Sequence, residues 1–216
     1  VRIAIMNVAS PFNIFKAFIG ENLYNNKFAA LREALQNAID TCHKKLKDHT
    51  NDGLPYTPKI TLTLTDETLT ITDNGMGMNE YIVENYFARL ARSSYNHGKS
   101  QDLLKNAIAQ FGIGVFSYFL IADWFEVATH RENDPPLRFR AHPNPNIYFY
   151  FQNNTDDIEI GTSIILHLKP ELQSKIEKLS FEKLVETVKH YIRYVDIPLD
   201  ISYKDREPIR IEKQAF

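Results

Sequence analysis

The sequence has a single cysteine, Cys42, so no disulfide can form within the chain. It has no apolar run long enough to cross a bilayer. It also lacks an excess of charge of one sign, because 25 basic and 27 acidic residues leave a formal net charge of -2. A nucleic-acid-binding domain usually carries a basic footprint, which is missing here. These absences favour a globular protein in a reducing, cytoplasmic setting that binds neither membrane nor nucleic acid.

The composition is that of an ordinary folded domain. The 216 residues are 44% hydrophobic and 24% charged, which suits one domain with a sizeable core. The chain opens with Val1 rather than methionine and ends shortly after a strand-like segment. We therefore expect residues 1–216 to form a single domain, the N-terminal part of a longer protein.

Hydrophobic periodicity places helices mainly in the first half of the chain and strands in the second. Helical spacing predicts helices over 12–24, 27–46, 79–91, 114–121 and 181–194. Alternation of apolar and polar residues predicts strands over 60–65, 69–73, 124–130, 138–141, 147–151, 162–168 and 199–203. A polar loop is expected through 51–53. This order of elements indicates an α+β fold.

Four polar residues recur at helical spacing in the second predicted helix: Glu33, Asn37, Asp40 and Lys44. They project from one side of the helix, opposite the apolar side. A solvated polar stripe would show the same pattern. An amide in mid-helix, however, is a poor helix former and a suitable neutral oxygen ligand for magnesium. Asn37 is therefore a candidate metal ligand, and Glu33, one turn away, a candidate general base for a metal-ordered water.

The segment Asp-Asn-Gly-Met-Gly-Met at 73–78 follows the second strand of a predicted hairpin. It can be interpreted simply as a glycine-rich turn. If the Asp73 carboxylate instead points into a pocket, it accepts hydrogen bonds and donates none, which selects the amine of adenine over guanine. Gly75 and Gly77 would let the backbone approach the flat ring, and Met78 would pack against its face.

A second glycine pair, Gly112 and Gly114, lies among Phe111, Ile113 and Val115 just before a predicted helix. Backbone N–H groups at the positive end of a helix dipole form a cradle for anions such as phosphate. A flexible entry into the helix is the alternative. The segment lacks the Gly-Lys-Ser/Thr ending of a P-loop and the third glycine of a dinucleotide fingerprint, so both of those nucleotide folds are disfavoured.

The last segment of interest is the start of the strand at Gly161 and Thr162. The Thr162 hydroxyl could hold a water or a base edge, although by itself the segment is only a strand. Five of the eight glycines lie in the three glycine-bearing segments: Gly75, Gly77, Gly112, Gly114 and Gly161. Glycine destabilises the interior of helices and strands, so this concentration indicates close approach of the backbone to something.

Taken in order, these segments resemble the ATPase superfamily of gyrase, heat-shock chaperone, histidine kinase and MutL mismatch-repair proteins, the GHKL ATPases. Within this superfamily, the motif sequences are most similar to those of the amino-terminal domain of the heat-shock protein 90 chaperones, over roughly residues 20–204. Four passages carry this resemblance: Leu31-Arg32-Glu33 with Asn37-Ala38 and Asp40, Asp73 to Met78, Gln110 to Gly114 with Ser117, and Gly161-Thr162 with Ile165 to Lys169.

The resemblance implies the Bergerat fold, a two-layer α/β sandwich with a mixed, mostly antiparallel sheet and helices on one face. It implies ATP or ADP bound with Mg²⁺, Glu33 as the catalytic base and Asn37 as the metal ligand. Residues 93–109 would form a lid. The implied nucleotide contacts are Asn37, Asp40, Lys44, Asp73, Gly75, Gly77, Met78, Asn85, Arg92, Phe111, Gly112, Ile113, Gly114, Val115 and Thr162.

The chain also departs from that family's pattern. The lid segment is shorter, Tyr86 stands where asparagine is usual, with Asn85 one place earlier, and Arg92 replaces a lysine. Val115 replaces an aromatic residue near the phosphates. These departures bear on lid closure and phosphate contacts rather than on adenine binding. The family draws a catalytic arginine from a following domain, so residues 1–216 alone should hydrolyse ATP slowly or hardly at all.

The resemblance leaves three functional hypotheses open. The first is a chaperone-type switch in which ATP closes the lid, two copies of the full-length protein form a homodimer, and client proteins are remodelled. The second is the ATPase module of a signalling, defence or DNA-processing protein. The third is a module that binds nucleotide without turnover, against which Glu33 and Asn37 count.

Overall fold

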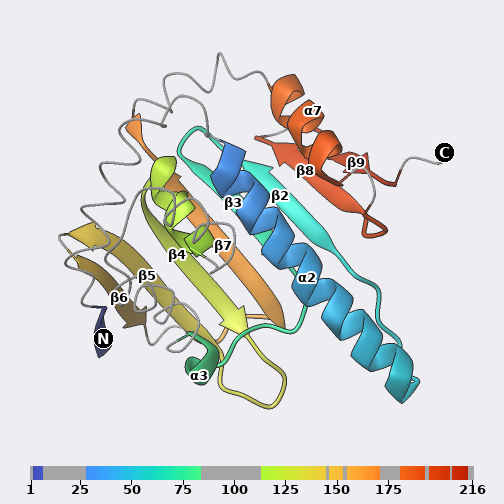
Figure 1. The fold of residues 1–216 in the computed structure, drawn as a ribbon, viewed down its shortest axis with the longest axis horizontal. Helices are drawn as coiled ribbons and strands as arrows, with labels where there is room; N and C mark the ends of the chain where they lie inside the picture. Colours follow the sequence, from blue (N-terminus) through green and yellow to red (C-terminus); the bar gives the residue numbers. More distant parts are fainter. Residues whose placement is uncertain are drawn as a thin grey trace, which may run out of the picture.

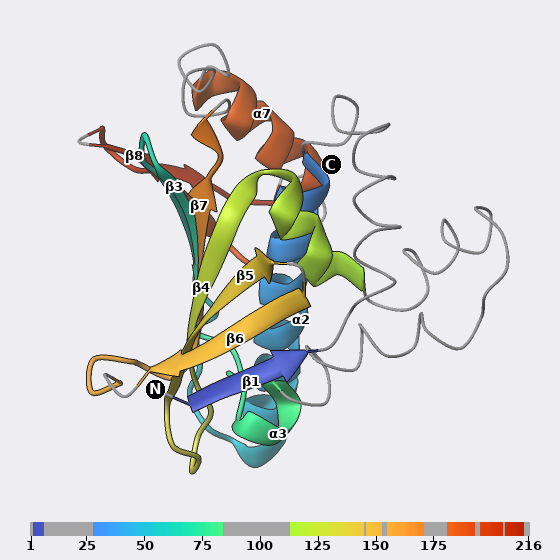
Figure 2. The ribbon, with the colours of Figure 1, turned by 90° about the vertical axis from the view of Figure 1, so that its left-hand side faces the viewer.

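A computed structural model describes residues 2–6, 28–83, 113–144, 146–152, 155–170, 181–192, 195–204 and 206–213. Within these ranges the chain forms one nine-stranded sheet with the order β1-β6-β5-β4-β7-β3-β2-β8-β9. Neighbouring strands run antiparallel except β2 and β8, which are parallel. The helices α2, α7 and η3 lie on one face of this sheet (Figures 1 and 2). The α+β class and the two-layer arrangement predicted from the sequence are confirmed.

The long helix α2, Phe28–Asp52, crosses the middle of the sheet (Figure 1). It forms because small and apolar residues recur every three or four positions, including Leu31, Leu35 and Cys42, which are at most 2% exposed. The helix was predicted to end at 46 and to be followed by a loop through 51–53, which was wrong. The helix continues six residues further, to Asp52. It ends at Gly53, whose φ of +69° is the left-handed conformation that closes many helices.

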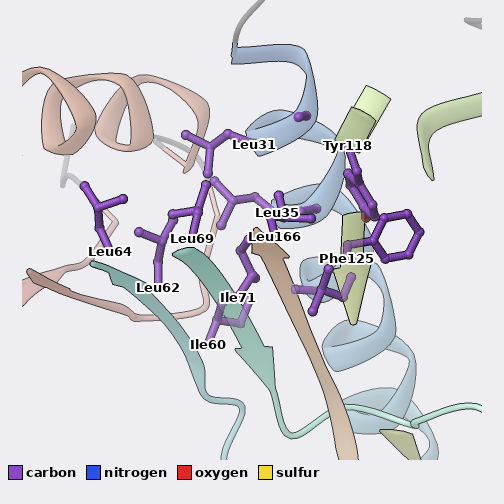
Figure 3. Packing of buried hydrophobic residues seen from close by; sticks show 14 of the residues in the cluster. Leu31, Leu35, Ile60, Leu62, Leu64, Leu69, Ile71, Tyr118, Phe125 and Leu166 are labelled. Atoms are coloured by element: carbon purple, nitrogen blue, oxygen red, sulfur yellow. The ribbon is translucent and has the colours of Figure 1, made fainter. Parts of the chain in front are cut away.

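The hairpin of β2, Ile60–Leu64, and β3, Thr68–Asp73, packs one face against α2. Inward-facing residues of both strands are buried, and the threonines between them face the other way. Figure 3 shows Leu62, Leu69 and Ile71 meeting Leu31 and Leu35 of the helix. Each such fully buried aliphatic side chain contributes roughly 1.5–3 kcal/mol relative to exposure.

The remaining predicted strands are confirmed, and all of them except β8 are longer than expected. They are β4 Ala122–His130, β5 Leu137–Asn144, β6 Asn146–Gln152, β7 Gly161–Leu168 and β8 Leu199–Tyr203. One edge strand, β1 Arg2–Met6, was not predicted, and β9 Ile209–Ile211 lies in the strand-like segment near the end of the sequence, for which no bounds were predicted. With three residues, β9 is too short for alternation to define its bounds.

The helical predictions have mixed outcomes. Helix α7, Phe181–Ile192, is confirmed, with its apolar side buried. The predicted helix over 114–121 is a 3-10 helix, η3, Ile113–Leu120, which leads directly into β4. Of the predicted helix 79–91, only α3, Glu80–Ile82, is described, capped by Asn79, whose side chain accepts from the Ile82 N–H. The predicted helix 12–24 lies outside the described residues. Among the described helices, none has both the length and the apolar character needed to span a bilayer.

Two glycines allow close packing of the backbone around the end of β3. Gly77 has a φ of +64°, and a Cβ added there would run into the carbonyl oxygen of His130. Gly161 has a φ of +130°, and a Cβ there would run into the carbonyl oxygen of Asp73. Any side chain at either position would push the end of β3 away from β4 and β7. These glycines therefore fix where Asp73 sits.

We predict that Gly77→Ala destabilises the protein far more than Gly53→Ala. Both glycines are left-handed, but nothing lies within 4 Å of a Cβ at Gly53. The Gly53 variant should lose about 1–2 kcal/mol from backbone strain alone. The Gly77 variant adds a clash with backbone and should lose ~3 kcal/mol or more. Urea unfolding of both variants measures the difference, and equal losses would contradict this packing at the end of β3.

Candidate functional site

Asp73 is the last residue of β3, and its side chain faces the α2 side of the sheet. It is 8% exposed. Its Oδ1 accepts a hydrogen bond from the backbone N–H of Gly75 at 2.8 Å. One residue after Gly75, the Met76 N–H donates to the hydroxyl of Thr41 on α2 at 3.0 Å. The turn after β3 therefore holds the carboxylate from one side and is itself tied to the helix.

Burial raises the pKa of the Asp73 carboxyl from 3.8 to about 7. Removal from water disfavours the charged form, and this effect is larger than the opposing ones. Hydrogen bonds from the backbone of Gly75 and Thr162, together with the positive charge of Lys45, act to lower the pKa. A buried acid that titrates near neutral pH is a frequent property of functional sites.

Thr162 lies directly opposite Asp73 in the register of β7 and β3. Its hydroxyl is 3.0 Å from the hydroxyl of Thr129 on β4. The Thr129 hydroxyl donates to the carbonyl of Gly161 at 3.0 Å and accepts from the Met78 N–H at 2.8 Å. Because Thr129 has only one hydroxyl proton, Thr162 must donate to it. The Thr162 oxygen is then left as an acceptor beside Asp73.

On α2, Glu33 and Asn37 lie one turn apart, as their spacing predicts. The Asn37 Nδ2 donates to Glu33 Oε1 at 3.3 Å and to the hydroxyl of Tyr118 at 3.5 Å. Tyr118 comes from η3, is fully buried, and packs edge-on against Phe125 (Figure 3). Both hydrogen bonds use the amide nitrogen. Among the described residues, the Asn37 carbonyl oxygen has no hydrogen-bond partner.

Tyr118 also shows that the two halves of the site are close together. Burial raises the pKa of its hydroxyl, and the nearby charges of Glu33 and Asp73 raise that pKa further. Asn37 contacts this phenol directly, and the end of β3 lies on the same helix-covered side of the sheet. Asp73 and Asn37 therefore lie on the same side of the sheet. Binding of one ligand by both residues requires this arrangement.

The other predicted site residues are placed with less detail. Asp40 is exposed and accepts from Gln36 at 2.7 Å, and Lys44 is exposed one turn further along α2. Met78 and Val115 are half-buried and pack against the core. Ile113 and Gly114 belong to the start of η3. Asn85, Arg92, Phe111, Gly112 and the lid segment 93–109 lie outside the described residues.

Gly75 and Gly77 were expected to let the backbone approach a ligand. The structure gives a sufficient reason for each within the protein. A Cβ at Gly75 would lie 2.5 Å from Cγ2 of Thr41, and one at Gly77 would meet the backbone of His130. Their glycine identity therefore follows from packing of the turn, and ligand contact remains a prediction.

Four residues in the site were not singled out from the sequence: Thr41, Lys45, Asn74 and Thr129. Asn74 lies inside the 73–78 segment, and its side chain binds the backbone of Lys59 and Thr57. Thr41 follows Asp40 and could have been found from its helical position. Thr129 is a buried threonine in a strand, and only its hydrogen bonds reveal its role.

A cavity of about 410 Å³ also borders Asp73 and Thr162, but from the other side of the sheet. Its floor is formed by Thr61, Thr72 and Ser163, which alternate away from the helices, and by the segment 157–160. The sheet separates this cavity from the space beside α2. It therefore lies on the face of the sheet opposite to Asn37 and Glu33.

Comparisons with known proteins show the family to which the chain belongs. The family model described as histidine kinase-, DNA gyrase B-, and HSP90-like ATPase matches residues 24–141. This segment carries α2, the hairpin of β2 and β3, η3 and β4, and therefore most of the site.

Curated relatives are similar over most of the chain. A chaperone protein HtpG from Borreliella afzelii is 32% identical over 197 residues, which cover 87% of this chain and 31% of the relative. An HtpG from Wolinella succinogenes is 31% identical over 205 residues, with 86% and 31% covered. The chain thus spans about a third of the length of these relatives. From its matched family model, the chain belongs to the histidine kinase-, DNA gyrase B-, and HSP90-like ATPases.

Proposed function

We propose that the space between α2 and the end of β3 binds the adenine of ATP, with Asp73 as the group that recognises the base. The observation that carries this proposal is the cross-strand pair of Asp73 and Thr162. Both present hydrogen-bond acceptors at one point, because the Thr162 proton is used on Thr129. Adenine offers an amine donor at the matching edge, whereas guanine offers a carbonyl acceptor that this pair would repel.

The α2 stripe supports a magnesium-dependent reaction at the other end of the nucleotide. Magnesium takes few protein ligands and keeps phosphate oxygens and waters in its shell. The Asn37 carbonyl oxygen fits this need, since its amide nitrogen already bonds Glu33 and Tyr118. The metal would polarise the phosphates and order a water. Glu33, held beside Asn37, would accept the proton of that water, which makes Glu33 the catalytic base.

For the whole protein we propose an ATP-driven chaperone of the HtpG type. The proposal rests on the similarity to HtpG chaperones over most of this chain. Residues 1–216 would be the single ATP-binding domain, and 93–109 its lid. Closing of the lid over ATP and pairing of two chains would exclude water and act on client proteins. A reducing, cytoplasmic setting suits a chain whose one cysteine is buried.

We predict that ADP affinity rises with pH between about 6 and 8 and that Asp73→Asn removes this dependence. The pKa of the Asp73 carboxyl is about 7, and the adenine amine binds the ionised form better. Below that pKa, affinity should fall by up to about tenfold per pH unit. The Asn variant should bind ADP at least ~10-fold more weakly at pH 8. Calorimetric titration without magnesium measures both effects.

Adenosine serves as the control ligand in this experiment, because it has no phosphate that titrates near neutral pH. Wild-type affinity for adenosine should follow the same pH profile as ADP. If Asp73→Asn binds ADP as tightly as wild type at pH 8, the assignment of the pocket is wrong.

We also predict that Asp73→Asn stabilises the ligand-free protein at pH 8. The unfolded chain releases the Asp73 proton near pH 3.8, whereas the folded protein keeps it until about pH 7. Stability is therefore lost as pH rises between these values, by roughly 4 kcal/mol. Thermal unfolding should show the Asn variant more stable at pH 8 and the gap closing towards pH 4. Glu132→Gln, at an exposed carboxylate, should change stability little at either pH.

Finally, Glu33→Ala should abolish turnover while ADP affinity stays within about twofold of wild type. Glu33 would act on water rather than on the nucleotide, so its loss should lower the rate by roughly 10²-fold or more. Phosphate release by the full-length protein is the measurement. A variant that still turns over at the wild-type rate would remove Glu33 from the mechanism, and loss of ADP binding would show a structural role instead.

A further inference from the structure

Lys45 lies on α2 one turn beyond Thr41 and reaches across to the turn after β3. Its ammonium donates to the carbonyl oxygen of Asn74 at 3.0 Å and to that of Gly75 at 3.3 Å. It also lies 4.9 Å from the centroid of the Tyr56 ring. Hydrogen bonds from a charged donor are stronger than those between neutral groups, and the Tyr56 ring adds a cation–π contact. Lys45 therefore fixes the turn relative to the helix.

The same turn holds the Asp73 carboxylate. The Gly75 N–H donates to Asp73 Oδ1, and the Gly75 carbonyl oxygen accepts from the Lys45 ammonium. One residue therefore connects the two charged groups. The neighbouring Asn74 side chain is also fixed, because its Oδ1 accepts from the Tyr56 hydroxyl at 3.0 Å and from the Lys59 N–H at 2.8 Å. A shift of the ammonium would move the donor that orients the carboxylate.

Lys45 is the one cation of α2 whose charge lowers the pKa of the Asp73 carboxyl. Among the described residues, the other titratable groups that interact electrostatically with it are the Cys42 thiol on the same helix, the Tyr56 hydroxyl from the loop before β2, and the Tyr118 hydroxyl from η3. Burial raises the pKa of all three, which keeps them uncharged at neutral pH. On the strand side, the backbone of Thr162 contributes a hydrogen bond and no charge.

We propose that Lys45 is a positioning residue of the adenine pocket, which holds the turn at 74–75 and thereby orients the Asp73 carboxylate for the base amine. This inference rests on the proposed function. Lys45 does not itself contact the nucleotide. It acts through Gly75 and through its charge, so its effect is greatest where Asp73 titrates.

The test is the pH profile of ADP binding by Lys45→Met, measured calorimetrically from pH 6 to 9. The positive charge of Lys45 lowers the Asp73 pKa, whereas burial raises it. Loss of that charge should therefore raise the Asp73 pKa and move the midpoint of the profile to higher pH. ADP binding at pH 7 should weaken by about three- to tenfold, and the difference should shrink at pH 9, where the carboxyl is ionised in both proteins. Lys47→Met is the matched control, since Lys47 is exposed on the same helix.

Two further variants separate charge from packing. Lys45→Arg keeps the charge and should restore most of the midpoint, whereas Lys45→Gln keeps a donor without charge and should behave like Lys45→Met. A uniform loss of affinity at every pH without rescue by arginine would make Lys45 a packing residue only and overturn the proposal. An unchanged profile in Lys45→Gln would overturn it too, including when Lys45→Met does not fold.

A carboxyl ¹³C NMR titration of Asp73 without nucleotide keeps this test separate from the proposed function. The Asp73 pKa should be higher in Lys45→Gln than in wild type, whether or not ADP binds. If Asp73→Asn binds ADP normally, the adenine assignment fails. If that assignment holds and the Asp73 pKa does not change in Lys45→Gln, the role of Lys45 fails alone.

Discussion

The rest of the structure depends on a carboxylate buried at the end of β3. Asp73 is 8% exposed, and its pKa of about 7 shows how strongly its surroundings disfavour the charge. A buried acid of this kind destabilises a fold and persists only where other contacts hold it. Here those contacts are the N–H groups of Gly75 and Thr162 and the charge of Lys45. In the proposed function this carboxylate is the acceptor for a donor supplied by the ligand.

The two layers of the fold bring the ligand-binding groups together. The sheet supplies acceptors at the ends of β3 and β7, and α2 supplies Asn37 and Glu33 across from them. In the proposed function neither layer is complete alone, since Asp73 would recognise one end of a nucleotide and the helix stripe would serve the other. Tyr118 from η3 is hydrogen-bonded to Asn37, and the charge of Asp73 raises the pKa of its hydroxyl. Packing of the two layers would therefore set the geometry of binding.

The sequence predicted those parts of this arrangement that depend on local periodicity. Alternation in β2 and β3 predicted the buried face of the hairpin, and helical spacing placed Glu33 and Asn37 on one stripe. The network of Thr129 was not predictable, because its partners are 32 to 51 residues away in the chain. Lys45 looked like one more lysine in a polar helix end. The C-terminal end of α2 was misplaced because a polar segment continues the helix to Gly53.

The central claim is that Asp73 binds the base in its ionised form, which can be measured on the carboxyl itself. By linkage, a ligand that prefers the ionised form must lower the pKa of that group. Carboxyl ¹³C NMR of Asp73 with and without saturating ADP, from pH 5 to 8, measures this directly. We predict that ADP lowers the Asp73 pKa from about 7 by at least one pH unit. A pKa that ADP leaves unchanged or raises would contradict the binding of adenine to this carboxylate.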